Sequence, residues 1–356
     1  MRRYKRTVVA VALATTVAGG TAGWASGGAQ RAVTGAPPGS AAWRAEGVPG
    51  RPLPDPATAD PREIAAFFRT LTPGRQRELA HRHPSVVGNL DGAPVALRYE
   101  ANALAIRAGH DPRYLRLAAP GRQILAFDPR GRGQVAEVYG DLTAAPRVSV
   151  VVPGSDIDAG SFDRAKDPYG TPAGMAVSLR TATGDRTAVV AWTGYTTPVG
   201  IGLDAATGDL AEAGAGRLAR FTQGLVAAGA AEPALFCHSY GSVVCGLAAS
   251  EVNATDIVVC GSPGMRADRV ADLRTDARVW AAKDPSDWIS KVPNVEFAGL
   301  GHGPDPAGAA FGARRVPAAT AHGHTGYFAP GTDSLRAFAA IALGESAGAG
   351  TTGESR

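Results

Sequence analysis

Short apolar segments of strand character, separated by longer helical stretches, constrain the fold of this chain more than any other feature. Residues 148–152 are almost continuously apolar, which is typical of a strand that helices cover on both faces. Between two such segments, Leu218, Phe221 and Leu225 recur at helical spacing. This alternation predicts an α/β fold with a mostly parallel sheet flanked by helices. The predicted strands cover residues 123–127, 134–139, 147–152, 187–192, 234–237, 256–260 and 278–282.

A helical region precedes these strands. Asp60 can cap a helix that has Pro61 at its first position, and Ile64, Phe67 and Phe68 then follow at helical spacing. Two more helices are predicted over 72–79 and 95–108. The predicted organisation is a helical N-terminal region over 58–117, an α/β domain over 118–345 that ends in a helix at 334–343, and a disordered tail over 346–356.

The first thirty residues have the pattern of a secretory signal peptide. Four basic residues lie within positions 2–6, and small and apolar residues without charge follow over 7–20. This stretch is shorter than the ~20 residues that a membrane-spanning helix needs. We therefore predict a signal peptide over 1–29, cleaved after Ala25 or Ala29, and a secreted product without a stable membrane span. Residues 30–57 are rich in Gly, Pro, Ala and Arg, which predicts a flexible linker.

The charge pattern argues against nucleic acid as a partner. The formal net charge of +4 comes from scattered arginines, and no basic stripe is interleaved with aromatic side chains. The apolar share of 45% and the charged share of 19% are ordinary for a globular protein, which argues against disorder throughout.

Three cysteines allow at most one intramolecular disulfide, and an exported chain permits one. Cys237 and Cys260 end strands that we expect to be neighbours, and Cys245 lies two helical turns past Ser239. The pattern leaves open a bridge between Cys237 and Cys260, a bridge between Cys245 and Cys260, or three buried free thiols that act as small apolar side chains.

Residues 237–241 (Cys-His-Ser-Tyr-Gly) are the strongest local signal for catalysis. A predicted strand leads into Ser239 and a helix of small residues leads out, which is the context of a nucleophile elbow. Gly241 is small enough for strand and helix to approach, and Cys237 stands where glycine is usual. The alternative is a buried serine that caps the helix. We expect His238 to pack away from Ser239, and the N–H of Tyr240 to serve as an oxyanion donor.

The acid of a catalytic triad should follow a later strand, because the order along chains with this elbow is serine, acid, histidine. The segment 283–289 supplies two carboxylates after the last predicted strand. Asp287, followed by the apolar Trp288 and Ile289, fits the expected turn better than Asp284, and Asp305 is a third choice.

The base should lie in the loop before the final helix. His324 is the first choice there, with His322 and His302 as alternatives. The second oxyanion donor should come from the loop after the third strand, where we predict Ser155. Asp156 is unusual at that place, since a carboxylate opposes a developing oxyanion, and it either faces outward or recognises a positive group.

A metal site is the competing interpretation of these histidines. His322 and His324 have the His-x-His spacing that can bind a metal ion, with His302 and Asp305 nearby in sequence. No helical His-x-x-x-His pattern and no adjacent cysteine supports it. We therefore predict neither a metal nor another cofactor.

Several short segments resemble one known family. They are Pro-Ser-Val-Val-Gly-Asn-Leu-Asp-Gly-Ala-Pro at 84–94, Val-Pro-Gly at 152–154, Cys-His-Ser-Tyr-Gly-Ser at 237–242, Gly-Ser-Pro-Gly at 261–264, and Gly-His at 323–324 with Tyr-Phe at 327–328. Together they resemble an actinobacterial α/β-hydrolase family long known as a domain of unknown function. The resemblance implies the α/β-hydrolase fold, puts Ser239 and His324 at motif positions, favours Asp287, and implies no substrate.

We therefore expect a secreted serine hydrolase that cleaves an ester or related acyl bond through an acyl-enzyme, with a small-molecule or acyl/peptide substrate. A peptidase, amidase or acyltransferase on the same fold is the first alternative. The second is a non-catalytic hydrolase-fold protein that binds a component of the cell envelope, because fold does not determine function.

Overall fold

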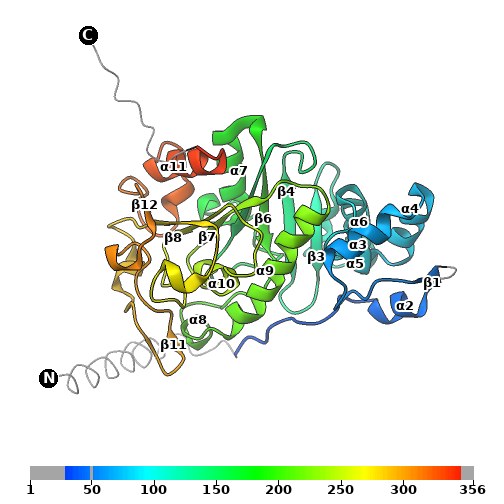
Figure 1. The fold of residues 1–356 in the computed structure, drawn as a ribbon, viewed down its shortest axis with the longest axis horizontal. Coiled ribbons are helices and arrows are strands. Elements are labelled where there is room, and N and C mark those ends of the chain that lie inside the picture. Colours follow the sequence, from blue (N-terminus) through cyan, green and yellow to red (C-terminus); the bar gives the residue numbers. More distant parts are fainter. Residues whose placement is uncertain (1–28, 49–50, 346–356) are drawn as a thin grey trace, which may run out of the picture.

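The computed structural model describes residues 29–48 and 51–345. The predicted signal peptide, apart from residue 29, and the predicted tail lie outside these residues. An eight-stranded sheet runs through the molecule in the order β12-β9-β8-β7-β5-β6-β4-β3 (Figure 1). Its strands are β3 (Ile124–Asp128), β4 (Gln134–Tyr139), β5 (Arg147–Val152), β6 (Thr187–Thr193), β7 (Pro233–His238), β8 (Asp256–Cys260), β9 (Arg278–Ala282) and β12 (Arg314–Val316).

Most of this sheet is parallel. The strands from β12 to β6 in the sheet order are all parallel to their neighbours, and β4 runs antiparallel to both β6 and β3. Strands β6, β7 and β8 are buried along their whole length, as apolar strands between two helical layers must be. The predicted α/β fold with a mostly parallel sheet is therefore confirmed.

Helices cover both faces of the sheet and divide the core into two apolar clusters. Figure 1 shows α7 and α11 on one side of the sheet and α9 and α10 on the other. Helix α10 follows β7 directly and packs on α9. The turn between β7 and α10 therefore lies at the edge of the sheet where the parallel strands have their carboxyl ends. These helices are α7 (Pro172–Thr183), α8 (Leu203–Ala206), α9 (Asp209–Ala227), α10 (Gly241–Ala248) and α11 (Asp333–Ala342).

The helical N-terminal region has an apolar core of its own and docks on β3 and α9. As predicted, Asp60 caps the first helix, with its side chain accepting a hydrogen bond from the N–H of Arg62. Asn102 joins the region to the sheet by donating to the carbonyls of Gly88 and Ile124, each at 3.0 Å. The helices are α3 (Pro61–Arg69), α4 (Pro73–Arg82), α5 (Pro84–Val87) and α6 (Val95–Gly109).

The segment predicted as a flexible linker instead makes defined contacts with both parts of the molecule. Trp43 is fully buried and its indole N–H donates to the carbonyl of Pro54 at 2.7 Å. The N–H of Val33 donates to Thr196 at 3.1 Å, beyond the end of β6. Composition alone did not predict these contacts, because the segment is rich in turn residues and a single buried tryptophan anchors it. The segment holds α2 (Ser40–Ala45), β1 (Gly47–Val48) and β2 (Arg51–Pro52).

Short elements complete the loops around the sheet. The hairpin of β10 (Glu296–Phe297) and β11 (Leu300–Gly301) lies in the long connection between β9 and β12. Within residues 29–48 and 51–345, no helix combines the length and apolar character needed to cross a membrane. The 3-10 helices span Leu115–Ala118, Pro168–Gly170, Gly184–Arg186, Val270–Leu273, Trp288–Lys291, Ala309–Phe311 and Gly326–Phe328.

Candidate active site

Ser239 occupies a sharp turn between β7 and α10. Its φ of 55° lies in the left-handed region, which non-glycine residues rarely adopt and which often marks a functional turn. The N–H of Ser239 donates to the carbonyl of Cys260 at 2.9 Å and fixes the turn against β8. A Cβ on Gly241 would lie 2.5 Å from the carbonyl oxygen of Val152, so only glycine lets α10 approach this closely. This is the geometry of a nucleophile elbow.

Ser239, His324 and Asp287 form a continuous hydrogen-bonded series. The Nε2 atom of His324 lies 2.9 Å from the Oγ atom of Ser239. On the other side of the ring, Nδ1 lies 2.9 and 3.0 Å from the two carboxylate oxygens of Asp287. The three residues predicted as nucleophile, base and acid therefore lie together, from the ends of β7 and β9 and the loop before α11.

Asp287 is held as a carboxylate by donors on several sides. It is 2% exposed, and burial alone would raise its pKa. Hydrogen bonds from His324, from the N–H of Ile289 at 2.9 Å and from the hydroxyl of Tyr327 at 2.7 Å outweigh burial and lower that pKa. The ionised Asp287 then selects the tautomer of His324 with a proton on Nδ1, which leaves Nε2 free to accept the serine proton.

The two other carboxylates considered as the acid have different partners. Asp284 accepts hydrogen bonds from the N–H of Gly323 at 2.6 Å and of Ser286 at 2.9 Å, so it anchors the loop that carries His324 without contacting the imidazole ring. Asp305 pairs with Lys283 at 2.6 Å. Among the described residues, neither makes a hydrogen bond with the ring of His324.

The other histidines considered as the base do not reach Ser239. His322 is exposed, with a φ of 55°. His302 is buried, and its Nε2 donates to the carbonyl of Ala205 at 2.7 Å. Burial lowers the pKa of His302 to about 4, so this ring stays neutral at ordinary pH.

His238 packs beside the triad and helps to position His324. Its Nε2 donates to the backbone carbonyl of His324 at 2.7 Å, and the two ring centroids are 4.7 Å apart. Burial, and then the nearby His324, lower the pKa of His238 to about 3, which keeps it uncharged beside the catalytic base. This matches the expected packed histidine.

The loop after β5 lies directly against Ser239 and offers space for an oxyanion. A Cβ on Gly154 would lie 2.6 Å from the Cβ atom of Ser239, so glycine leaves room there. The N–H groups of Ser155 and Tyr240, the predicted donors, make no hydrogen bond within the described part of the chain. Asp156 points elsewhere, because its carboxylate accepts from the N–H of Gly200 at 2.8 Å.

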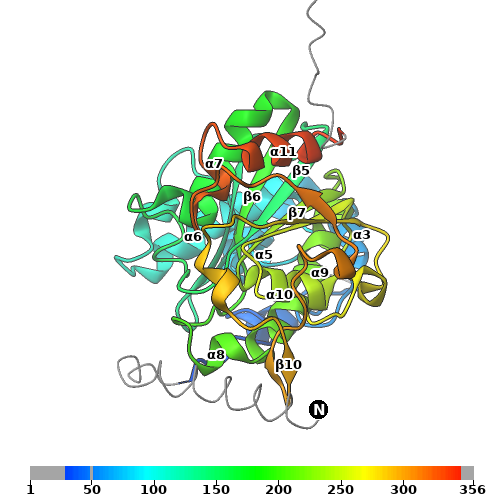
Figure 2. The same cartoon turned by 90° about the vertical axis from the view of Figure 1, so that its left-hand side faces the viewer.

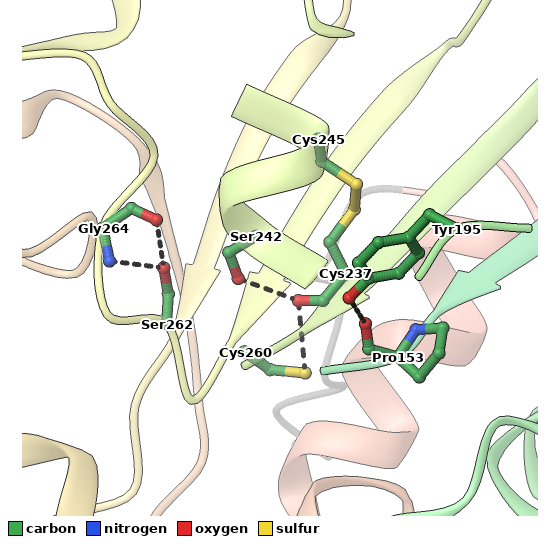
Figure 3. Close-up of a disulfide and its surroundings, with 8 residues drawn as sticks. All are labelled: Pro153, Tyr195, Cys237, Ser242, Cys245, Cys260, Ser262 and Gly264. Carbon is green, nitrogen blue, oxygen red and sulfur yellow. Dashed lines mark hydrogen bonds between the residues drawn. A yellow bond between two sulfur atoms is a disulfide. The ribbon is translucent and has the colours of Figure 1, made fainter. Parts of the chain in front are cut away.

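One disulfide spans the elbow, but not in either of the predicted pairings. Cys237 is bonded to Cys245, with the two Cα atoms 6.5 Å apart, and Cys260 is a buried free thiol (Figure 3). The register explains the correction. Cys237 pairs with Val259 and His238 pairs with Cys260, so the side chains of Cys237 and Cys260 point to opposite faces of the sheet. Cys237 and Cys245 both belong to the apolar cluster under α10.

Residues 29–48 and 51–345 contain no group of three or more His, Cys, Asp or Glu side chains arranged to hold a metal ion. His302, His322 and His324 instead have the separate surroundings described above: His302 bonds to a backbone carbonyl, His324 belongs to the triad, and His322 is exposed. The triad and the two free backbone donors supply a nucleophile, a base and oxyanion stabilisation, which together can perform acyl chemistry.

Three neighbours of the triad were missed as site residues. Tyr327 orients the acid, Gly154 opens the space beside the nucleophile, and Trp288 lies against His324 with ring centroids 4.7 Å apart. Each of the three lies close in the sequence to a predicted site residue, and residues that flank a catalytic group often pack against it. This proximity was the available signal. Nothing in the local pattern indicated that the hydroxyl of Tyr327 would turn back to Asp287.

The chain is similar to several known proteins. Residues 128–297 match a family model described as alpha/beta hydrolase. Two uncharacterized proteins from strains of Mycobacterium tuberculosis are each 27% identical over 375 aligned residues, which cover 82% of this chain. The matched part is 57% of those relatives' length, so this chain spans little more than half of them. A solved Xanthomonas campestris structure, described as a serine hydrolase without lid, is 20% identical with a TM-score of 0.33, over 48% of this chain and 74% of that one.

Proposed function

We propose that this chain, an α/β hydrolase by its fold and by the family that residues 128–297 match, is a serine hydrolase that cleaves esters or related acyl bonds. The observation that carries the proposal is the hydrogen-bonded series from Ser239 through His324 to Asp287. A hydroxyl becomes an effective nucleophile when an adjacent oriented base accepts its proton. All three groups have the distances that this proton transfer requires.

The proposed reaction passes through an acyl-enzyme. Oγ of Ser239 attacks the acyl carbon while Nε2 of His324 takes the hydroxyl proton, and His324 then gives that proton to the leaving group. Asp287 stabilises the imidazolium that forms between these steps. Water, activated by the same imidazole, then attacks the acyl carbon and releases Ser239. The N–H groups of Tyr240 and Ser155 would stabilise the negative oxygen in both steps.

Exposed apolar side chains, one of them in contact with the catalytic histidine, favour an apolar acyl group in the substrate. Trp288, which lies on His324, is 42% exposed. Ile201, next to the Gly200 that bonds Asp156, is 70% exposed, and Phe297 on the hairpin of β10 and β11 is 58% exposed. Figure 2 shows this hairpin beside α8, and Arg266 donates to the carbonyl of Gly299 in the hairpin and lies beside Gly208, which follows α8. An acyl chain that covers apolar surface of this kind removes it from water, which makes the free energy of binding more favourable.

Labelling with a fluorophosphonate probe, measured by intact mass, tests the proposal. We expect one adduct on the folded protein, none on Ser239→Ala, and much slower labelling of His324→Ala. His322→Gln is the matched control, because this exposed histidine lies in the same loop and should leave labelling unchanged. Absence of an adduct on folded protein would contradict the enzyme proposal and favour a non-catalytic binding protein.

The leaving group is the second question. A series of p-nitrophenyl esters of increasing acyl length, compared with the matching anilides, separates an esterase from an amidase. Faster turnover in the presence of an added alcohol, with transfer product formed, would identify an acyltransferase. We expect esters to react fastest, with kcat/KM rising with acyl length because of the apolar surface around Trp288.

We also propose that the protein is exported, on the basis of its N-terminal pattern and the disulfide between Cys237 and Cys245. Disulfides persist mainly in oxidising compartments. Expression of the full chain with a C-terminal tag, followed by fractionation and N-terminal sequencing, tests the proposal. Cleavage near Ala25 or Ala29 in the extracytoplasmic fraction is expected, and an intact cytoplasmic product would contradict it.

A further inference from the structure

A cavity lies apart from the triad, between the N-terminal segment and the part of the sheet formed by β3, β4 and β6. Its volume is about 260 Å³, near the lower end of the ~300–1,000 Å³ that small-molecule pockets usually have. Residues near Thr34 and Pro56 line one side, α9 lines another, and Trp192 and Phe221 supply an aromatic wall. Neither Ser239 nor its two partners line it.

Positive charge dominates this cavity. Four guanidinium groups and two carboxylates line it, which gives the lining a net charge of two positive charges. We name it the arginine cavity after the four residues Arg98, Arg130, Arg217 and Arg220. Asp91 pairs with Arg98 at 3.1 Å and lies 4.0 Å from Arg220, while Asp128 pairs with Arg130 at 2.6 Å.

Arg217 carries the unpaired charge most clearly. Its Nε donates to the carbonyl of Gly194 at 2.6 Å, but its two terminal nitrogens have no hydrogen-bond partner within the described part of the chain. No described carboxylate lies within ion-pair distance of it. The guanidinium is partly accessible yet deep enough that burial lowers the pKa of Arg217. An anion in the cavity would restore the charge balance and fill these donor positions.

Gln134 is a buried amide without a partner at the same place. It is 3% exposed, and neither its Nε2 nor its Oε1 has a hydrogen-bond partner. Gln134 pairs in register with Asp128, and Ala136 and Val138 further along β4 belong to the core cluster under α9. Its side chain therefore shares the face of the sheet that bounds the cavity. A buried unsatisfied amide is costly and is seldom kept without a reason.

Gly216 provides space on the opposite wall. It lies within α9, where glycine is less favourable than alanine by roughly 1 kcal/mol. A Cβ on Gly216 would meet no protein atom within 4 Å, whereas Cβ atoms on Gly214 and Gly224 of the same helix would crowd their neighbours. Packing within the protein therefore explains the other two glycines but not Gly216, which is exposed and is one of the residues that line the cavity.

We propose that the arginine cavity is a binding site for a compact organic anion that carries a carboxylate or phosphate group. The guanidinium of Arg217 would hold the anionic group, Gln134 would hydrogen-bond a polar atom of the ligand, and the aromatic wall would cover its carbon skeleton. Two net positive charges match a doubly charged anion better than a neutral molecule. The proposal does not depend on the reaction at Ser239.

Calorimetric titration in Tris chloride at low ionic strength tests the proposal with two probes. Inorganic phosphate represents phosphorylated ligands, and citrate represents carboxylates. We expect at least one of them to bind with a Kd below about 1 mM, and Arg217→Gln to weaken binding tenfold or more. Arg77→Gln is the matched control, since this exposed arginine on α4 lies outside the cavity. Ser239→Ala should bind the anion like the unaltered protein, which separates this site from the proposed catalysis.

Two variants exclude a loss of binding through unfolding. Gly216→Leu should narrow the cavity and weaken binding while the protein keeps its melting temperature. Gln134→Leu should raise the melting temperature of the ligand-free protein, because it removes an unsatisfied buried amide, and yet weaken anion binding. A Kd above about 1 mM for both probes, or equal binding by Arg217→Gln and Arg77→Gln, would overturn the proposal.

Discussion

The catalytic edge and the arginine cavity differ in how their polar side chains are satisfied. At the catalytic edge, each carboxylate oxygen of Asp287 accepts hydrogen bonds and both ring nitrogens of His324 have partners. In the arginine cavity, Gln134 has no partner and Arg217 uses one of its three nitrogens. The first site is complete as it stands, whereas the second lacks the atoms that would complete it.

This difference indicates two kinds of preparation in one fold. The triad is preorganised, so its groups need little rearrangement when charge develops on the substrate. The arginine cavity keeps charge and polarity uncompensated, which a ligand with the opposite charge can satisfy. Changes at one site should therefore leave the other intact, and the predictions below test that independence.

The largest effect should come from Asp287→Asn. The amide cannot stabilise the imidazolium or hold the correct tautomer of His324, so we expect kcat to fall by about 10³–10⁴-fold. Steady-state kinetics with an ester substrate measures this fall, and anion binding in the arginine cavity should not change. Asp284→Asn is the matched control, because Asp284 bonds the backbone of Gly323 and not the ring. Equal losses in both variants would contradict the assignment of the acid.

Removal of the disulfide should be the next largest effect, and it acts on stability. The bridge closes a loop with a sequence separation of 8, for which the chain-entropy relation gives roughly 2–3 kcal/mol. We expect the double variant Cys237→Ala/Cys245→Ala to lose about that much free energy of unfolding in urea titrations, with anion binding retained. Cys260→Ala should lose less, because a buried thiol contributes only as a small apolar group. A double variant as stable as the unaltered protein would contradict the pairing.

Tyr327→Phe should lower kcat about tenfold and leave KM nearly unchanged, since the hydroxyl acts on Asp287 and not on substrate. Loss of this donor should also raise the pKa of Asp287, which the hydroxyl now helps to lower. The acid limb of the pH–rate profile should therefore move to higher pH in the variant. An unchanged profile, with activity lost only through unfolding, would reduce Tyr327 to a packing residue.

The last prediction concerns stability in acid. His302 has a pKa of about 4 in the folded chain, against about 6.5 when unfolded, so only the unfolded chain binds its proton between these values. Its contribution to stability is complete above about pH 6.5 and falls as the pH drops towards 4, by at most about 1.4 kcal/mol per unit. Guanidinium groups in the arginine cavity stay charged throughout this range and add no such slope.

Urea titrations of His302→Gln between pH 7 and pH 5 measure this contribution. The variant should be less stable at pH 7, where it loses a hydrogen bond to Ala205, but its stability should change less with pH. His322→Gln, at an exposed position, is the control and should keep the full slope. A slope as steep in His302→Gln as in the control would show that other groups cause the acid sensitivity.

Local patterns and chain order were sufficient for the elbow and for seven of the eight strands of the sheet, whereas the short edge strand β12 was not predicted. Strand segments buried on both faces are continuous in sequence, and Gly241 follows Ser239 by two residues, so both features are visible without tertiary structure. Asp287 and His324 were accessible because an elbow serine restricts where along the chain its partners can lie. The apolar residues after Asp287 favoured it over Asp284, and the hydrogen bonds between His324 and Asp287 agree with that choice.

Features that depend on side-chain direction or on distant segments were not accessible in this way. The predicted bridge between Cys237 and Cys260 was wrong because the side chains at the ends of two adjacent strands can point to opposite faces of the sheet. The ordered segment before α3 depends on one tryptophan that reaches a distant carbonyl. The arginine cavity combines arginines from α6, α9 and the β3–β4 turn, which in the sequence were part of a scattered positive charge.

The bond between Cys237 and Cys245 also determines how this protein responds to thiol reagents. It consumes two of the three cysteines, and the third, Cys260, is 1% exposed with a thiol pKa that burial raises. We therefore expect the folded chain not to react with maleimides. A cysteine introduced at the exposed Val177 on α7 would be the single reactive thiol, so a fluorophore could be attached there without altering any native residue near the serine or the arginines.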